Sequence, residues 1–475
     1  MYNNFTTNGD KFSSTFAEFK KTFGIGEIIR SCGGSKLRGV PVMTVFTYLF
    51  SLIFQRRSMN MDQEKNTGGS IKKDTCHRFL SFDRIDWNKA ISLVALAIAR
   101  GIKSLRRKDC KGERMKPCFV ADDSSFYRNR SRKVELLSRC WDHAKNCSYK
   151  GFRMLTLCWT DGMTTLPVSF CNMSSANKKS RINEADTENC AEGSFGARIK
   201  ELAQRSAVDA LSSLIKDAMA QGLWASYLLC DRWFSSPKTV FSFLDCHLDV
   251  ISMLKDNTTR YVFEERELKM AKIFRALVDR DRMERRKNRK SGKGQNSRKY
   301  IFCTDVVMRD RQGAHADKAV RFVFVRNRNK KSSFLCIMCS DTSLSAEQIV
   351  EYYGARWSIE ELFLLSKSHL NLERTTQSTD YLQIHASTAI LMIQLQMIAF
   401  ERRMNSDEVS YGALFRLLLE EVTAEAMLRA LETLLAMFAS EVASQWSIPQ
   451  DHLKQMVDRF LNNLPEELKK SLLVA

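Results

Sequence analysis

The sequence lacks an apolar run that matches the length of a membrane span, which takes about 20 residues. Its longest apolar stretches, at 40–54 and 386–400, are interrupted by Thr, Tyr, Ser or Gln. Residues 1–10 are polar and rich in Asn and Thr, so they do not have the apolar centre of a secretory signal. We therefore expect a cytoplasmic protein without a membrane partner.

Two common catalytic motifs are also missing. The sequence contains neither the G-x-S-x-G turn that presents a nucleophilic serine nor the Walker loop that cradles nucleoside triphosphates. ATP-driven chemistry is therefore unsupported, and we expect no nucleotide cofactor.

The sequence contains many cysteines, but it lacks the spacing of a zinc site. Cys336 and Cys339 form a CxxC, and neither a second CxxC nor a His pair follows at zinc spacing. Four other cysteines lie in apolar, strand-like runs, where free Cys behaves as a small hydrophobe: Cys158, Cys171, Cys230 and Cys303. We expect reduced core cysteines, with a structural zinc as the minor alternative.

What the sequence has in excess is positive charge. It carries 74 Lys and Arg against 54 Asp and Glu, a net charge of +20 over 475 residues. Such an excess favours a polyanionic partner, because each neutralised phosphate releases counterions on binding. The length predicts about two to four structural units.

Strand-like runs follow a definite order in the middle of the chain. Strands are expected at 117–121, 152–160, 163–171 and 224–230, with the middle two joined by the hairpin signal Asp161-Gly162. One helix, beginning at Ser194 and stopping at Gly222, separates the last two strands. This is the order of a ribonuclease-H-like α/β fold, a mixed sheet with helices that brings distant carboxylates to one edge.

The stretch 232–352 is too long for a loop and contains strand-like runs, so we expect a β-rich insertion in that core. Helical regions are expected on both sides of the core. The predicted regions are a helical, DNA-end-binding N-terminus (1–112), the first part of the core (113–235), the insertion (236–342), the second part of the core (343–402) and a helical C-terminus (403–475).

A polar tetrad near residue 360 has helical spacing. Tyr353, Arg356, Glu360 and Lys367 fall within about 60° of one another on a helix, so they would form one stripe. A solvated helix face with internal ion pairs is the simpler interpretation of such a tetrad taken alone. Neighbouring Trp357 is expected to pack the helix onto the sheet, with a DNA-facing position as the alternative.

Acidic residues end two of the predicted strands. Asp122 and Asp123 follow the first strand, Asp231 follows the fourth, and Glu360 belongs to the tetrad. Oxygen ligands of this kind suit Mg²⁺, and two such ions can activate an attacking hydroxyl and stabilise a leaving oxygen at phosphorus.

The tetrad then shows a specific resemblance. Residues 353–367 read Tyr-x2-Arg-x3-Glu-x6-Lys, which resembles the signature of bacterial insertion-sequence transposases of the DDE type, in the cut-and-paste subgroup that forms hairpins. Residues 229–234 resemble the second-aspartate motif of that family, and 122–125 resemble the first. The resemblance covers roughly 117–380.

The resemblance implies a role for each matched residue. Asp122, Asp231 and Glu360 would chelate two Mg²⁺ ions, for which Mn²⁺ can substitute. Asp123 is the alternative to Asp122, because successive strand residues point to opposite faces and only one should meet the metals. Tyr353, Arg356 and Lys367 would hold the phosphates of the DNA end, Arg356 with two hydrogen bonds.

The resemblance also implies the reaction. The enzyme would excise its insertion sequence by strand nicking, hairpin formation and hairpin opening, and would then join it to target DNA. Its partners would be double-stranded DNA, as terminal inverted repeats and as target, and a second copy in a homodimer at the bacterial nucleoid. The C-terminal helices would form the dimer surface or simply cap the core.

Two further sets of residues are candidates for contact with DNA. The segment 282–299 carries nine Lys or Arg against one Glu and is expected to be a solvated loop or a DNA-contacting arm. Its candidate side chains are Arg285, Arg286, Lys287, Arg289 and Lys290. The family also places an aromatic residue of the insertion against a flipped base, for which Tyr261, Phe263 and Tyr300 are the candidates.

Two alternatives stay open from sequence alone. One is a ribonuclease-H-like nuclease that hydrolyses DNA without joining it, and the other is a DNA-binding protein without catalysis. The Arg and Lys of the tetrad argue against the nuclease, since they would hold a DNA end for reuse. The intact acidic residues argue against a DNA-binding protein without catalysis.

Overall fold

The fold is described from a computed structural model. It describes residues 14–36, 38–65, 71–106, 115–143, 145–186, 188, 190–291, 299–327, 333–374 and 377–404, with residues 414, 415, 419 and 459. The predicted C-terminal region and its dimer surface therefore lie almost entirely outside the described residues.

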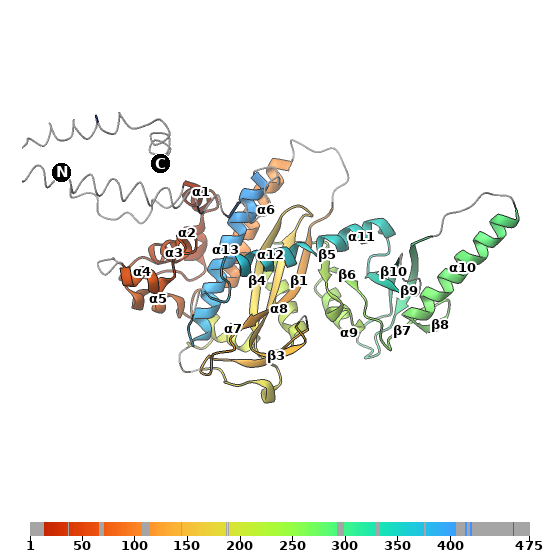
Figure 1. Ribbon diagram of the computed structural model, residues 1–475, viewed down its shortest axis with the longest axis horizontal. Helices are drawn as coiled ribbons and strands as arrows, with labels where there is room; N and C mark the ends of the chain where they lie inside the picture. The colour runs from red at the N-terminus through yellow and green to blue at the C-terminus, as the bar shows by residue number, and fades with distance from the viewer. Residues whose placement is uncertain are drawn as a thin grey trace, which may run out of the picture.

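Helices make up the N-terminal part of the described chain (Figure 1). They are α1 (Ser14–Thr22), α2 (Ile25–Ser31), α3 (Val42–Ser51), α4 (Met59–Lys65), α5 (Lys73–Leu80) and α6 (Trp87–Arg106). Aromatic rings hold them together, as where Phe16 of α1 stacks on Phe50 of α3 with ring centres 4.1 Å apart. Trp87 at the start of α6 is fully buried and packs edge-on against Phe79 of α5. Burial of such rings stabilises the helices, since short helices are marginal alone.

One mixed sheet runs through the rest of the molecule. Its strands are β1 (Cys118–Tyr127), β2 (Ser138–Asp142), β3 (Cys147–Thr160), β4 (Thr165–Met173), β5 (Tyr227–Cys230), β6 (Asp249–Met253), β7 (Arg260–Phe263), β8 (Arg266–Lys269), β9 (Ile301–Met308), β10 (Lys318–Arg326) and β11 (Phe334–Cys339). The strand order is β2-β3-β1-β5-β6-β11-β10-β9-β7-β8, with β4 added on β3.

The centre of this sheet has a ribonuclease-H-like arrangement. β1, β5 and β6 are parallel neighbours, β3 is antiparallel to β1, and β4 is antiparallel to β3. Asp161 and Gly162 turn the chain between β3 and β4, where Gly162 has φ +90° and the Asp161 carboxylate accepts backbone N–H groups of the turn. The mixed α/β architecture is consistent with the fold class predicted from the sequence.

Helices cover the sheet on either side of this centre. α13 (Tyr381–Met404) and α6 lie side by side against β4, as Figure 1 shows. The single helix expected from Ser194 is in fact two, α7 (Phe195–Leu202) and α8 (Ala207–Ala220), because Ser206 caps a second helix start through the Asp209 N–H. The second helix ends at Ala220, and Gly222, with φ +93°, follows its C-cap, close to the predicted stop.

α13 is the longest helix of the described chain, and most of its residues are buried. Its 24 residues are long and apolar enough to cross a membrane. The expectation that the apolar stretch around 386–400 is shorter than a membrane span was therefore wrong. However, 89% of its apolar window is buried inside the molecule, as in a core helix. Gln394 and Gln396 reach from α13 to backbone carbonyls of α3, α6 and β4.

His385 of α13 is fully buried between aromatic rings. Its imidazole stacks on Phe170 of β4 with centres 4.3 Å apart, and neither ring nitrogen has a hydrogen-bond partner among the described residues. Burial lowers the pKa of His385 to about 3. The ring is therefore neutral in the folded protein at neutral pH.

This burial predicts an acid sensitivity. Below about pH 6.5 the unfolded chain takes up a proton at His385 that the folded chain refuses until about pH 3, so stability falls as the pH drops through this window. His385→Phe keeps the stacking and removes the titrating group. Chemical denaturation at pH 7.5 and pH 5 should show a loss about 2 kcal/mol smaller in the variant than in the wild type. An equal loss in both proteins would contradict this account.

Residues after β5 extend the sheet. α9 (Pro237–Leu244) and β6 fall within the predicted insertion range 236–342, yet β6 pairs in parallel with β5 at the centre of the sheet. β11 then pairs antiparallel with β6, and β10, β9, β7 and β8 follow outward. Between β8 and β9 lies α10 (Met270–Lys290), which projects from this end of the molecule (Figure 1).

The cysteines of the described chain are all free. Cys158, Cys171 and Cys230 are buried, as predicted, but Cys303 is exposed because it faces outward from β9. Cys336 and Cys339 are three positions apart on β11, so their side chains leave opposite faces of the strand. In the described part of the chain they form no metal site.

Candidate active site

Two aspartates meet where parallel strands β1 and β5 run side by side. The register pairs Ala121 with Cys230, so the next residues, Asp122 and Asp231, stand next to each other. β5 ends at Cys230 because the chain turns into a 3-10 helix, Arg232–Phe234. β1 continues to Tyr127 rather than ending at residue 121, since it stays paired with β3 beyond the end of β5. Asp122 therefore lies within a strand.

Asp122 and Asp123 point to opposite faces of β1. Asp122 Oδ2 accepts a hydrogen bond of 2.9 Å from Arg356 Nη1, and Asp122 Oδ1 accepts the Asp123 backbone N–H. Asp123 forms an ion pair with Arg153 of β3 instead. Both carboxyl groups lie within electrostatic range of Asp231. Asp122 thus faces the tetrad, and Asp123 faces β3.

The tetrad spans two helices instead of one. α11 (Ala346–Ala355) begins with a capping box at Ser345, and α12 (Ser358–Ser368) follows after a tight turn. In this turn the Trp357 N–H bonds to the Gly354 carbonyl and the Glu360 N–H to the Trp357 carbonyl, three residues back. The single straight helix expected from the spacing was therefore wrong.

Arg356, in this turn, connects two of the acidic residues. Its Nη1 donates to Asp122 and its Nη2 donates to Glu360 Oε1 at 2.5 Å. The guanidinium also lies over the Tyr353 ring, 5.7 Å from the centre. Arg356 is buried, so one cation compensates two carboxylates that lie partly out of water.

Burial raises the pKa of Asp122 to about 7, although the Asp123 N–H and Arg356 oppose this shift. The neighbouring carboxylates of Asp123 and Asp231 raise it further. Burial likewise raises the pKa of Asp123, against the effect of Arg153. A site that resists ionisation in this way favours additional positive charge.

The raised pKa of Asp122 predicts a stability cost. Because its folded pKa of about 7 exceeds the unfolded value of 3.8, stability is lost as the pH rises from about 4 to 7. Asp122→Asn removes this ionisation. We expect the variant to be about 1–2 kcal/mol more stable than the wild type at pH 8 and no more stable at pH 4, in urea unfolding curves. If the variant were less stable than the wild type at pH 8, ionised Asp122 would not destabilise the folded protein.

Of the other two members of the tetrad, Lys367 reaches β1, whereas Tyr353 lies within electrostatic range of Asp231 and Cys230 at the end of β5. The Lys367 ammonium donates to the Ser125 carbonyl at 2.8 Å and lies 3.7 Å from Glu373. Burial lowers the pKa of Lys367, while Glu373 acts in the opposite direction. The Tyr353 hydroxyl is buried without a hydrogen-bond partner among the described residues, and burial raises its pKa to about 12. Its hydroxyl reaches solvent or DNA only if the surrounding side chains move.

Trp357 is 60% exposed, so the expectation that it packs the helix onto the sheet was wrong. The tight turn places Arg356 inward and leaves the next residue pointing out. The indole of Trp357 is therefore exposed on the surface of the described chain.

The donor chemistry of the site suits a divalent cation. Asp122, Asp231 and Glu360 offer only carboxylate oxygens, and burial raises the pKa of Asp122, whose ionised form therefore gains from positive charge. As placed, no three acidic, His or Cys side chains of the described residues are grouped to hold an ion. The reason is visible at Glu360 and Asp122, where the Arg356 guanidinium lies between the carboxylates. The carboxylate chemistry of these residues fits a hard cation, whereas their positions in the described chain do not group them around one.

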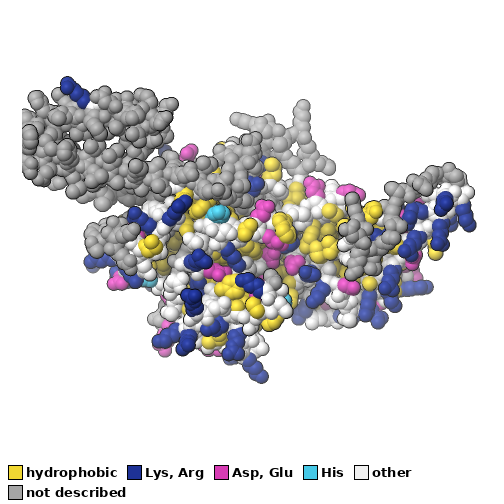
Figure 2. All heavy atoms as spheres, in the orientation of Figure 1, with side chains coloured by type: hydrophobic (Ala, Val, Ile, Leu, Met, Phe, Trp, Pro, Cys, Tyr) yellow, Lys and Arg dark blue, Asp and Glu magenta, His cyan; other side chains and the backbone are white. Residues whose placement is uncertain are grey.

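The basic segment is a helix rather than a loop as far as Lys290. Four of its predicted DNA-binding residues are exposed on α10, namely Arg286, Lys287, Arg289 and Lys290. Arg285 is half-buried and pairs with Asp281 at 2.8 Å. Figure 2 shows the Lys and Arg side chains along α10, far from the acidic side chains at the centre of this face.

Two of the aromatic candidates for base stacking are excluded by burial. Tyr261 and Phe263 of β7 lie in the core between the outer strands and α10. Tyr300, next to β9, is exposed.

Two side chains of the site escaped the sequence interpretation. Arg153 of β3 pairs with Asp123, and its guanidinium lies 5.4 Å from the ring centre of exposed Trp233. Trp233 follows Asp231 by two residues, and this closeness in sequence could have indicated that it belongs to the site. Arg153 is found only through the register of β1 and β3, which the sequence does not state.

Comparison with known families agrees with this site. The chain matches a family model described as a transposase DDE domain over residues 198–393, and one described as a DDE superfamily endonuclease over 48–272. These matches support a DDE-type transposase. No curated protein matches the chain.

The two DDE matches divide the site between them. The first range contains Asp231 and the tetrad, and the second contains Asp122, Asp123 and Asp231. Together they reach across the strands and helices that meet at the acidic residues.

Proposed function

We propose that this protein is a transposase that excises an insertion sequence and joins it to target DNA by two-metal phosphoryl transfer. The observation that carries the proposal is that Asp122 and Glu360 share Arg356, while Asp231 follows the parallel strand next to Asp122. The DDE family matches support DNA as the substrate.

Asp122, Asp231 and Glu360 are the residues that would hold two Mg²⁺ ions, or Mn²⁺ in their place. Bound ions would supply activation of a hydroxyl or water and stabilisation of the leaving oxygen. Asp122 is preferred over Asp123 because it shares Arg356 with Glu360, whereas Asp123 is paired with Arg153.

The cations of the tetrad position the DNA end. Arg356 is able to bind a phosphate with two hydrogen bonds once it leaves its carboxylates, and Lys367 supplies a second charge farther along β1, at Ser125. Tyr353 supports the Arg356 guanidinium with its ring. Nicking, hairpin formation, hairpin opening and strand transfer use this one site, since each is a phosphoryl transfer.

Parts remote from the site bind the rest of the DNA. The basic face of α10 contacts DNA phosphates through its exposed Arg and Lys side chains. The N-terminal helices read the terminal inverted repeat, for which exposed Arg38, Arg56 and Lys73 provide charge. The protein acts as a homodimer at the bacterial nucleoid, each copy binding one end.

An assay with pre-cut transposon ends and supercoiled target plasmid tests the proposal. Joined products that require Mg²⁺ or Mn²⁺ are expected. Nicked target without joined ends would favour the nuclease alternative. DNA binding without either product would favour a protein that has lost catalysis.

A further inference from the structure

Arg153 of β3 lies beside β1, in register with Ser125. Residues two apart on a strand share a face, so Arg153 lies on the same face as Ser125 and Asp123, and its guanidinium forms an ion pair with Asp123. Asp122 leaves the other face, where it accepts a hydrogen bond from Arg356. Adjacent residues of β1 are therefore held by two arginines, one on each face of the strand.

The guanidinium of Arg153 also reaches the turn that begins at Asp231. It lies 5.4 Å from the ring centre of Trp233, within the range of a cation–π contact. Trp233 belongs to the 3-10 helix Arg232–Phe234, which follows Asp231 directly. Arg153 thus connects the residue after Asp122 to the turn after Asp231.

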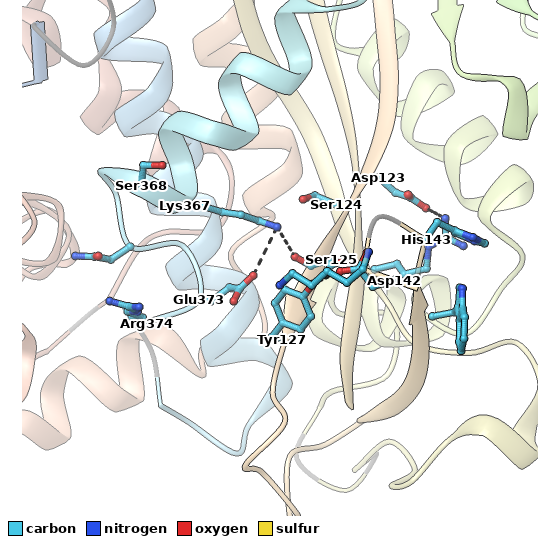
Figure 3. Close-up of a pocket in the computed structure, with 14 residues that line it drawn as sticks. Asp123, Ser124, Ser125, Tyr127, Asp142, His143, Lys367, Ser368, Glu373 and Arg374 are labelled. Carbon is cyan, nitrogen blue, oxygen red and sulfur yellow. Dashed lines mark hydrogen bonds and ion pairs between the residues drawn. The ribbon is translucent and has the colours of Figure 1, made fainter. Parts of the chain in front are cut away.

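His143, after β2, lies next to the same side chains. Its ring centre is 6.3 Å from that of Trp233, and its imidazole lies within electrostatic range of Asp123. Figure 3 shows Asp123 and His143 together on one side of a hollow, with Lys367 on the other side. The ion pair and the indole therefore belong to one group of contacts, separate from the contacts of Lys367.

The backbone pairing of β1 and β5 stops short of Asp231. Its last pair is Ala121 with Cys230, so Asp231 lies one residue beyond the paired positions. In the turn that follows, the Phe234 N–H bonds to the Asp231 carbonyl at 3.0 Å, and the Phe234 ring is buried. Trp233, by contrast, is 56% exposed. Its contact with the guanidinium supplies a second attachment of the turn, on the side of β1.

We propose that Arg153 is a positioning residue that fixes Asp122 and Asp231 relative to each other. It does so from the far face of β1, through the neighbouring carboxylate of Asp123 and the indole of Trp233. The proposal rests on the proposed function, since it concerns the placement of the acidic residues of the same site.

The shape of the guanidinium determines which variants separate its two contacts. Arg and Lys both neutralise a carboxylate, but the planar guanidinium also stacks flat on an aromatic ring. Arg153→Lys therefore keeps a cation for Asp123 and weakens the contact with Trp233, whereas Arg153→Ala removes both contacts. Trp233→Ala removes the second contact alone.

Cleavage of a radiolabelled DNA end in Mg²⁺ tests the inference, with rates measured at increasing DNA concentration. Arg153→Ala is expected to lower kcat about 10- to 100-fold and to leave KM within about twofold of the wild-type value, because it disturbs the geometry of the acidic residues and not the binding of DNA. Trp233→Ala should lower kcat about 10-fold. Arg153→Lys should recover part of the loss of Arg153→Ala.

A double variant shows whether the two side chains act as one link. Arg153→Ala combined with Trp233→Ala should cleave no more slowly than Arg153→Ala alone, since both substitutions remove the same contact. DNA-end binding, measured by anisotropy in EDTA so that no cleavage occurs, should be unchanged in each variant.

Arg321→Ala is the matched control. Arg321 of β10 pairs with Asp305 on the neighbouring strand, as Arg153 pairs with Asp123, and its side chain is 23% exposed against 31% for Arg153. It lies in the outer part of the sheet, beyond β11. Loss of this ion pair should lower the stability in urea, as in Arg153→Ala, while kcat and KM keep their wild-type values.

Four results would overturn the inference. A normal kcat in Arg153→Ala would remove the positioning role, and an equal fall of kcat in Arg321→Ala would make lost stability the cause. A loss confined to KM or to DNA-end binding would make Arg153 a direct DNA contact. Losses that multiply in the double variant would show two independent effects.

Failure of the proposed function looks different, because it is seen in the wild type before any variant is compared. The wild-type protein would then nick DNA without joining it, or give no product. With nicking alone, the lower kcat of Arg153→Ala would still be expected.

Discussion

Asp231→Asn and Glu360→Gln are each expected to reduce metal-dependent DNA cleavage at least about 1,000-fold while DNA-end binding stays within about threefold of the wild type. The expectation follows from the position of both carboxylates at the acidic edge, where each would hold an ion that the reaction needs. Neither substitution changes side-chain size appreciably, so the fold should be kept.

Glu361→Gln provides the control for this experiment. Glu361 is adjacent to Glu360 on α12 but is exposed on another side of the helix. Cleavage of radiolabelled ends and gel-shift binding should both be unchanged in this variant. Substantial cleavage by Glu360→Gln would remove Glu360 from the proposed metal ligands.

Arg356→Ala is expected to destabilise the protein by about 2–3 kcal/mol at pH 8, because it leaves the Asp122 and Glu360 carboxylates without their shared cation. At pH 5 the loss should be smaller, since Asp122, with a pKa of about 7, is then mostly protonated. Mg²⁺ should raise the unfolding temperature of the variant more than that of the wild type, because the guanidinium no longer competes for the carboxylates.

A surface ion pair with the same spacing gives the comparison. Arg205 and Glu201 are also four residues apart, but both are exposed, so Arg205→Ala should cost at most about 0.5 kcal/mol. DNA-end binding by Arg356→Ala should weaken as well, with cleavage falling further than binding. A normal cleavage rate would refute the positioning role of Arg356.

Sequence patterns predicted the central strands because local signals were strong. The Asp161-Gly162 turn, the stop at Gly222 and the apolar run before Asp231 each depend on a few neighbouring residues. The expected strand order brings distant carboxylates to one edge, and the register of β1 and β5 leads into Asp122 and Asp231 there. These features involve backbone preferences that act over short distances.

Other features depend on partners distant in sequence. Trp357 was expected inside because Trp is usually buried, but the turn at Arg356 gives the inward position to a guanidinium that has two carboxylates to meet. Asp122 and Asp123 differ in which arginine each one reaches, and this contact depends on residues distant in sequence. No periodicity encodes that choice.

The unbroken sheet has a mechanical consequence. Backbone hydrogen bonds link β5, which leads into Asp231, to β6, then to β11 and outward to the strands that flank α10. A hinge between these strands would have to break a row of such bonds at once. We therefore expect the sheet to move as one rigid unit. A displacement of α10 would tilt the strand that leads to Asp231, because no hinge separates the two.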